Sequence, residues 1–413
     1  MPLVKVDEVK FVKELYPRFE LDNYSVNQYR QSIDLLPPIL ISRSKILVDG
    51  YHRIIAHKLE EREEIEVEYF ESEDENEIFI EAIKRNNSHG KQLSIEEKQR
   101  LTPILYNKGL SLEDIQIILA IGKSKAYDWT KNIRIKEREE RDAEILELYL
   151  QCYSYREIAE KLGFDDHSLV GRVLENSING KIQQPDNVQY YNLWKIQSLH
   201  QTQLKYPGQT PLDLVENVIY YYTDPPKTNS IKFDLVVDPM AGSGIVREAC
   251  RKLYRQYLLY DKYPVREDIP IKENDILNGL PEEVQDVDLF YLDPPYFDLI
   301  NGYKETPFTE SYDSYLKSMN KVFEVIKPRL STKGKIAFEL KPYNAKNGGT
   351  WDGEWYDLTF DTIKEAQKYN LKIIKRICAP LTPAQFSGPE MTRAQENRVL
   401  LNLVRDVVIM GAA

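Results

Sequence analysis

The chain has 413 residues, 42% of them hydrophobic and 29% charged, so its length predicts two or three domains with apolar cores of their own. It contains no apolar run of about 18 residues and does not open with the apolar stretch of a signal peptide, which argues against a membrane protein and predicts a cytoplasmic one. Its three cysteines form no CxxC pair and its five histidines show no metal-ligand spacing, so neither a disulfide framework nor a metal site is expected.

The net charge of −11 comes from one segment of the chain. Between Glu60 and Glu81 there are twelve acidic residues against one arginine, so this segment alone carries the whole negative excess. A solvated surface is the simple interpretation of such a run, and a functional acidic arm is the alternative. Because the rest of the chain is balanced, the charge does not exclude a nucleic acid as partner, but the contact requires local basic patches.

The first 92 residues are predicted to form a small α/β domain. A short apolar strand leads to a turn at Asp49 and Gly50, and an amphipathic helix begins near His52. A second strand, 64–70, alternates apolar and acidic residues as a half-exposed strand does. A further helix is expected at 75–86.

Residues 93–182 are predicted to be helical, beginning with a capping box at Ser94. Two helix-turn-helix candidates follow, at 109–133 and 145–175, and each could equally be a packing pair of any helical bundle. Two in tandem before a further domain favour contact with double-stranded DNA. The cations expected to touch DNA are Lys123, Lys125, Lys131 and Arg172.

Residues 183–413, entered through a polar linker, alternate strand and helix, which predicts an α/β domain with a parallel sheet. A buried strand at 235–237 ends in a turn of small residues, after which a helix begins. Small residues let a ligand approach the main chain beyond the carboxyl end of a strand. The turn residues expected at this ligand are Asp238, Pro239, Ala241, Gly242, Ser243 and Gly244.

Two further acidic residues follow this turn. Asp261 ends the next strand, 256–260, where a carboxylate suits hydrogen bonding to ribose hydroxyls. Asp275 could accept a hydrogen bond from an adenine amino group, and a helix cap is the alternative interpretation.

The sharpest motif follows the strand 288–292. Two prolines, Pro294 and Pro295, hold the chain extended. The Asp293 carboxylate and the Pro294 carbonyl can then accept both hydrogens of an exocyclic amine, which leaves its lone pair free for an electrophilic methyl group. Tyr296 offers a face on which a flipped base can stack. The alternative is a proline-capped strand end with a structural tyrosine.

These residues resemble the amino-methyltransferases that act on DNA bases. Residues 238–244 are similar to the cofactor motif of that family, and residues 293–296 to its Asp-Pro-Pro-Tyr motif. The resemblance implies a class I, Rossmann-like seven-stranded fold over about 187–413, with a closing hairpin of strands 372–378 and 398–404. It also implies S-adenosyl-L-methionine as cofactor, with Gln209, Thr210 and Pro211 near its methionine end. Sequence selection would fall to the N-terminal region or to loops at 297–312 and 380–397.

The N-terminal domain resembles the ParB/sulfiredoxin superfamily. Residues 49–53 are similar to one family box and residues 86–93 to a second, although one arginine stands here where the family has a pair. The resemblance implies that Gly50, His52 and Arg53 hold a nucleotide phosphate at a helix N-terminus. A DNA-tethering or structural role is the alternative.

The predicted function is site-specific methylation of an exocyclic amino group of a flipped DNA base, with adenine N6 preferred over cytosine N4. Methylation of RNA or of a protein amide is a second hypothesis. A third is a nucleotide-switched, ParB-like DNA-binding protein with an inactive methyltransferase domain. A bound nucleotide and a homo-oligomer are left open.

Overall fold

The computed structural model describes residues 2–88, 92–178, 183–196, 210–226, 232–295, 306–340, 343–344, 355–380, 388–398, 400 and 404–412. They separate into two compact units, Met1–Arg141 and Asp142–Ala413. The division falls within helix α7 (Lys131–Leu150), inside the helical region predicted for 93–182. Among all the described residues, no helix has the length and apolar content needed to cross a bilayer.

The first unit contains a four-stranded sheet in the order β1-β4-β2-β3. Its strands are β1 (Leu3–Lys5), β2 (Ile39–Ser42), β3 (Leu47–Asp49) and β4 (Glu64–Phe70). Strand β4 has the predicted bounds, because its alternation buries Ile65 and Val67 and exposes the glutamates between them. The helices of the sheet domain are α1 (Asn23–Gln31), α2 (Tyr51–Leu59) and α3 (Glu75–Ser88).

The helices that follow are separated by turns at the predicted places. They are α4 (Ile95–Asn107), α5 (Leu112–Leu119), α6 (Lys123–Trp129), α8 (Tyr155–Leu162) and α9 (Ser168–Ile178), with α7 between α6 and α8. Ser94 and Glu97 form the expected capping box of α4, and Ser154 forms one with Glu157 at α8. Both predicted helix-turn-helix segments therefore contain a helix pair, α5–α6 and α8–α9.

The second unit contains the seven-stranded sheet, in the order β12-β13-β9-β8-β5-β6-β7. Its strands are β5 (Leu235–Asp238), β6 (Gln256–Asp261), β7 (Ile271–Glu273), β8 (Val287–Leu292), β9 (Leu330–Leu340), β12 (Leu371–Pro380) and β13 (Val404–Ala412). Strands β5 to β9 run parallel, and β13 is antiparallel to both of its neighbours. The parallel-rich sheet confirms the predicted α/β class.

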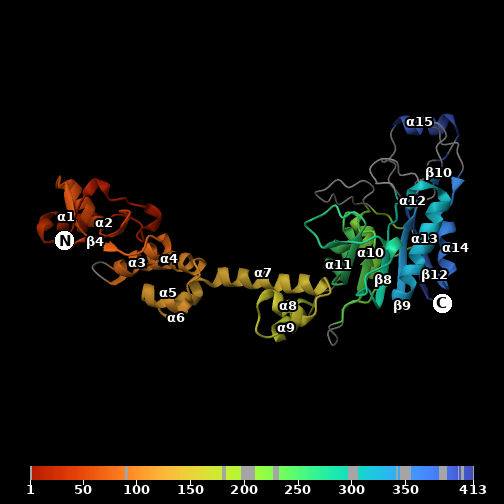
Figure 1. Ribbon diagram of the computed structural model, residues 1–413, viewed down its shortest axis with the longest axis horizontal. Coiled ribbons are helices and arrows are strands. Elements are labelled where there is room, and N and C mark those ends of the chain that lie inside the picture. Colours follow the sequence, from red (N-terminus) through yellow and green to blue (C-terminus); the bar gives the residue numbers. More distant parts are fainter. Residues whose placement is uncertain are drawn as a thin grey trace. The chain divides into compact units, whose positions relative to one another are not determined.

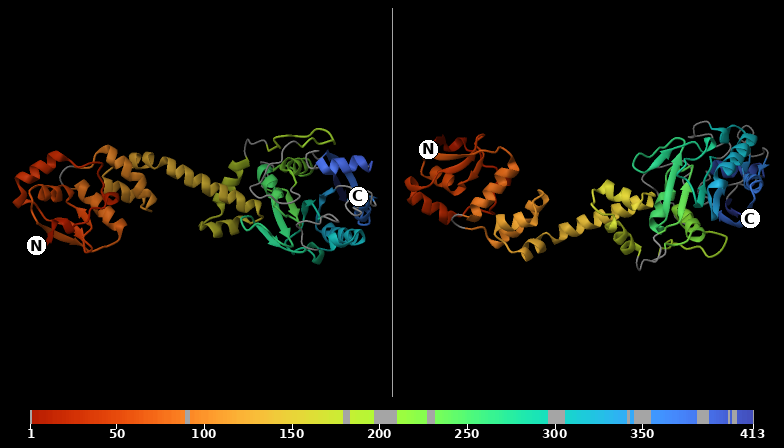
Figure 2. Two further views of the ribbon diagram at one scale, coloured as in Figure 1. Left: turned by 90° about the horizontal axis from the view of Figure 1, so that it is seen from above. Right: turned by 60° about the horizontal axis from the view of Figure 1, so that its bottom comes forward.

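Helices cover both faces of this sheet (Figure 1). One layer contains α10 (Leu212–Tyr222) and α11 (Ile245–Leu253), and the other contains α13 (Tyr312–Ile326) and α14 (Leu358–Gln367). Figure 2 shows the same chain from two further sides, and the two helix layers pack against the sheet through two separate hydrophobic clusters. The remaining elements of the unit are α12 (Pro307–Glu310), α15 (Gly388–Glu396) and the short pair β10 (Tyr343–Asn344) and β11 (Trp355–Tyr356).

The chain crosses from β5 to β6 and β7 on one side and returns to β8 and β9 on the other. The order thus reverses between β5 and β8, the place at which open α/β sheets leave a crevice for a ligand.

One predicted strand is wrong in its bounds. The second strand of the closing hairpin is predicted at 398–404, of which 399 and 401–403 lie outside the described residues, whereas β13 extends from Val404 to Ala412. Strand β13 pairs with both β9 and β12, so its side chains are covered on both faces of the sheet. A continuous apolar run is needed there, and Val407–Met410, which is buried, supplies it. Part of the 297–312 loop forms α12, and part of the 380–397 loop forms α15.

Candidate functional site

The glycine turn joins β5 to α11. Gly242 has a φ of +46° and Gly244 a φ of +74°, so both lie in the left-handed region that glycine adopts without strain. A Cβ atom on Gly244 would lie 2.1 Å from Cδ1 of Ile269, so a larger residue here would require the Ile269 side chain to shift. The positive φ values and this close packing together favour glycine in the turn.

Asp238 ends β5 and is 3% exposed. Its Oδ1 accepts a hydrogen bond of 3.0 Å from the Met240 N–H. Burial raises the pKa of Asp238 well above its usual range, and the nearby carboxylates of Asp293 and Asp261 raise it further. A cation placed beside Asp238 would therefore stabilise its charged form.

Asp261, at the end of β6, connects the glycine turn to that strand by a hydrogen bond. Its Oδ2 accepts from the Gly242 N–H at 2.9 Å and its Oδ1 from the Tyr263 N–H at 2.8 Å. Each carboxylate oxygen accepts more than one hydrogen bond, so the group keeps acceptor capacity for a ligand hydroxyl.

Asp293 follows β8 directly and is half-buried, while Pro294 is buried. Oδ2 of Asp293 accepts a hydrogen bond of 2.9 Å from the hydroxyl of Thr210, which precedes α10. The structure therefore places three segments that are distant in sequence, those of Thr210, Asp238 and Asp293, at the carboxyl ends of β5 and β8.

A cavity of about 230 Å³ lies at this edge of the sheet. Its lining includes most of the residues predicted for the cofactor and for catalysis, namely Thr210, Asp238, Pro239, Ala241, Gly242, Ser243, Asp261, Asp275, Asp293 and Pro295. Pro211 caps α10 and Gly244 caps α11 beside it. Gln209 and Tyr296 lie outside the described residues.

Asp275 caps a short 3-10 helix, Ile276–Asn278, as the alternative interpretation expected. Its Oδ1 accepts from the Leu277 N–H at 3.1 Å, and its Oδ2 lies 2.9 Å from Nζ of Lys262. It also lines the cavity, so the cap does not remove it from the reach of a ligand.

Sequence reasoning missed a buried acidic residue beneath Asp293. Glu339 of β9 is 1% exposed and accepts from the Tyr291 hydroxyl at 3.1 Å. Nε of Arg405, on β13, lies 2.9 Å from Glu339 Oε1. The available signal was one glutamate within the apolar run Ile336–Leu340, since a buried charge is rarely placed without a partner.

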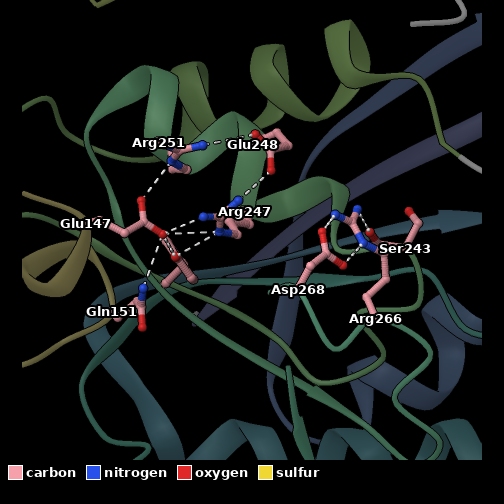
Figure 3. A network of polar contacts seen from close by, with 9 residues as sticks. Glu147, Gln151, Ser243, Arg247, Glu248, Arg251, Arg266 and Asp268 are labelled. Carbon is pink, nitrogen blue, oxygen red and sulfur yellow. Dashed lines mark hydrogen bonds and ion pairs between the residues drawn. The ribbon is translucent and has the colours of Figure 1, made fainter. Parts of the chain in front are cut away.

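A second polar network lies behind the glycine turn (Figure 3). In it, Glu147 points from α7 toward two arginines of α11: its Oε1 lies 2.7 Å from Arg247 and its Oε2 lies 2.8 Å from Arg251. The Tyr257 hydroxyl donates to Glu147 at 2.7 Å. Burial acts to raise the pKa of Glu147, but the Tyr257 hydroxyl and the arginines outweigh it and hold the pKa below its usual value.

A separate ion pair drawn in the same view contacts the glycine turn. Arg266, which pairs with Asp268, also donates to the Ser243 carbonyl at 3.3 Å (Figure 3). Residues of α7, α8 and α9 share one hydrophobic cluster with α10, α11 and β5. The helix pair α8–α9 is therefore built into the unit that holds the cavity.

We expect Glu147→Gln to lower the free energy of unfolding by about 1–3 kcal/mol, because it removes one of the two carboxylates, Glu147 and Glu248, that Arg247 and Arg251 share. Urea denaturation followed by circular dichroism measures the change. Glu144→Gln is the matched control, since Glu144 is exposed on the same helix and its loss should cost less than about 0.5 kcal/mol. Equal effects of the two substitutions would contradict this role of Glu147.

The residues predicted to bind a phosphate line a cavity of about 460 Å³ in the first unit. Gly50, with a φ of +113°, caps α2. Arg53 is bonded to the Asp49 carboxylate at 2.6 Å and to the carbonyls of Pro37 and Pro38. Nε2 of His52 accepts from the Asp22 N–H at 3.0 Å. The side chains of His52 and Arg53 are therefore both hydrogen-bonded to other groups of the first unit.

The cations predicted to contact DNA lie in two places. Lys123 and Lys125 are exposed on α6, each beside an aromatic ring, and Lys131 is exposed at the first residue of α7. Arg172 is exposed on α9.

Comparisons with known proteins found similarity over parts of the chain. The "Streptomycin biosynthesis operon possible regulatory protein" of Streptomyces griseus is 38% identical over 90 residues, which are 22% of this chain and about a quarter (25%) of that relative's length. A TehB-like methyltransferase of Corynebacterium glutamicum is 12% identical, over 48% of this chain and 87% of that one, with a TM-score of 0.29. The chromosome-partitioning protein ParB of Caulobacter crescentus, complexed to its parS site, is 14% identical over 43% and 94% of the two chains, with a TM-score of 0.26.

A family model, described as DNA methylase, matches residues 37–272, more than half of the chain. The match runs from the first unit through the glycine turn to β7. The chain therefore belongs to the N6/N4 DNA methylase family.

Proposed function

We propose that this protein transfers a methyl group from S-adenosyl-L-methionine to the exocyclic amino group of a base in double-stranded DNA, with adenine N6 as the target. The observation that carries the proposal is the shared cavity, which residues of the glycine turn after β5 line together with Asp293 and Pro295 after β8. Membership of the DNA methylase family supports it.

The residues around the cavity fit this cofactor. Ala241, Gly242 and Ser243 line the cavity, and Asp261 has acceptor capacity for the ribose hydroxyls. The buried Asp238 carboxylate, which lines the same cavity, favours a cationic group beside it. When bound, the cofactor supplies an electrophilic methyl group on a sulfonium.

Asp293 and the Pro294 carbonyl then accept the two hydrogens of the target amine and turn its lone pair toward the methyl group. Transfer of the methyl group to the amine nitrogen would release the sulfur as a neutral thioether, and positive charge would develop on the nitrogen. The Asp293 carboxylate stabilises that charge and is placed to take the proton that the nitrogen releases. Tyr296 is proposed to stack on the flipped base.

The test uses purified protein with labelled S-adenosylmethionine and unmethylated double-stranded DNA, followed by digestion and nucleoside mass analysis. N6-methyladenine is the expected product. N4-methylcytosine would keep the mechanism and change the base. Label in RNA or protein, but not in DNA, would overturn the proposed substrate.

We further propose the domain division 1–92, 93–182 and 183–413, with a ParB/sulfiredoxin-like first domain and a class I methyltransferase domain last. The 460 Å³ cavity beside α2 is the proposed nucleotide site, because Arg18 and Arg85 also line it. Calorimetry with nucleoside triphosphates tests this, and an absence of binding would leave the first domain a tethering or structural role.

The helix pair α5–α6 is the proposed DNA-binding element of the first unit, together with Lys131, and Arg172 is the proposed contact of α9. We expect the double substitution Lys123→Ala and Lys125→Ala to weaken DNA binding and to reduce the slope of log affinity against log salt by about 1 per lost phosphate contact. Fluorescence anisotropy over a salt series measures both quantities.

The control removes two charges elsewhere in the same unit. Lys5→Ala with Lys13→Ala also removes two exposed lysines, so it should leave the salt slope unchanged. If both double variants lower the affinity equally, net charge alone accounts for the effect and α6 is not the contact.

A further inference from the structure

Asp293 has to present its carboxylate in one orientation if it is to receive an amine hydrogen. The side chain is only half-buried, at the end of a strand, where packing alone restricts it weakly. The Thr210 hydroxyl, 2.9 Å from Oδ2, supplies a directional bond. An orientation fixed by a hydrogen bond depends in turn on how firmly the donor is held.

Thr210 is held between two carboxylates. It is 3% exposed, and its hydroxyl lies 3.3 Å from each carboxylate oxygen of Glu339. A hydroxyl has one hydrogen to donate, so Thr210 serves either Asp293 or Glu339 at a given moment. The shorter distance, 2.9 Å, favours Asp293.

Glu339 has a hydrogen-bond donor and an ion-pair partner besides Thr210. The Tyr291 hydroxyl donates to it at 3.1 Å, and Arg405 Nε lies 2.9 Å away. These two groups satisfy the buried Glu339 charge without the hydrogen of Thr210. The Asp293 carboxylate has acceptor sites beyond the one that Thr210 occupies, so it can receive an amine hydrogen while it keeps the Thr210 bond.

We propose that Thr210 is a positioning residue for methyl transfer, which orients Asp293 and which the Tyr291–Glu339–Arg405 network holds in place. The role differs from contact with the cofactor, because it acts on the acceptor of the target amine. It rests on the proposed function. The parts come from β8, β9, β13 and the residue before the N-cap of α10, so all of them belong to the second unit.

The test compares Thr210→Val, which has the shape of threonine without its hydroxyl, with Thr210→Ser, which keeps the hydroxyl. Thr210→Val should lower kcat about 10- to 100-fold, while the calorimetric Kd for S-adenosylmethionine changes by less than about twofold. Thr210→Ser should restore most of kcat. Thr362→Val is the matched control, since this fully buried threonine bonds to the Tyr315 hydroxyl and not to Asp293.

A second variant tests the network from its far side. Tyr291→Phe keeps the ring but removes the hydroxyl, so Glu339 draws the Thr210 hydrogen away from Asp293 and kcat should fall, with Kd again unchanged. Wild-type kcat in Thr210→Val, or a rise in Kd with unchanged kcat, would overturn the positioning role alone. A wild-type protein that binds S-adenosylmethionine but methylates no DNA base would overturn the proposed function and this inference together.

Discussion

Replacing Asp293 with alanine should reduce the rate of methyl transfer by at least about 10²- to 10³-fold, the usual loss when a group that stabilises developing charge is removed. The alanine variant accepts neither an amine hydrogen nor the proton released after transfer. Initial rates with labelled S-adenosylmethionine and DNA measure the loss.

The substitution should leave the fold and the binding of cofactor intact. Thr210 retains Glu339 as an acceptor, and Glu339 retains Tyr291 and Arg405, so no buried hydrogen-bonding group loses its last partner. Asp313→Ala, at an exposed position on α13, is the control for the loss of a carboxylate. If methyl transfer survives in Asp293→Ala, this carboxylate is not the acceptor of the amine.

Replacing Asp238 with asparagine should stabilise the ligand-free protein and weaken cofactor binding at the same time. Asparagine keeps an oxygen for the Met240 N–H and removes a charge that burial and two neighbouring carboxylates disfavour. The same change removes an attraction for the cationic sulfonium, so the Kd for S-adenosylmethionine should rise by about tenfold.

The stability gain has a defined pH dependence. Because the pKa of Asp238 is raised in the folded state, the folded wild type binds more protons than the unfolded chain. Its stability therefore falls as pH rises from about 3.9, the pKa of an unfolded aspartate, until the raised folded-state pKa is passed. The advantage of Asp238→Asn should widen over that range, by about 1.4 kcal/mol for each unit by which the pKa is raised.

Thermal unfolding of ligand-free protein at several pH values measures this advantage. Asp165→Asn, at an exposed position, should show no such widening. An Asp238→Asn variant that is less stable than the wild type at neutral pH would mean that the charge is compensated in the folded protein.

The sequence predicted those parts of the site that depend on neighbours along the chain. The glycine turn, Asp261 at the end of β6 and the Asp-Pro-Pro segment each follow a short buried strand, and such strands are recognisable from apolar runs. Their meeting at one cavity follows from a parallel sheet, whose strands all end at the same edge.

The sequence could not predict contacts that depend on the order of strands. Glu339 and Arg405 are neighbours because β13 inserts beside β9, and that register cannot be derived from either segment alone. The bounds of β13 were wrong for a similar reason, since two apolar runs were available and only pairing selects between them. Likewise, the sequence of α7 does not reveal that Glu147 meets Arg247, a hundred positions later.

The place of β13 in the sheet has a consequence for biosynthesis. It follows all other strands in chain order, yet it lies between β9 and β12 and supplies Arg405 to Glu339. While the ribosome makes the chain, the polypeptide up to β12 therefore has a gap within its sheet and an acidic side chain without its arginine. Cells that stall translation late in this gene should accumulate a fragment that holds the Asp293 motif but is inactive and prone to pair its open strand edges with other chains.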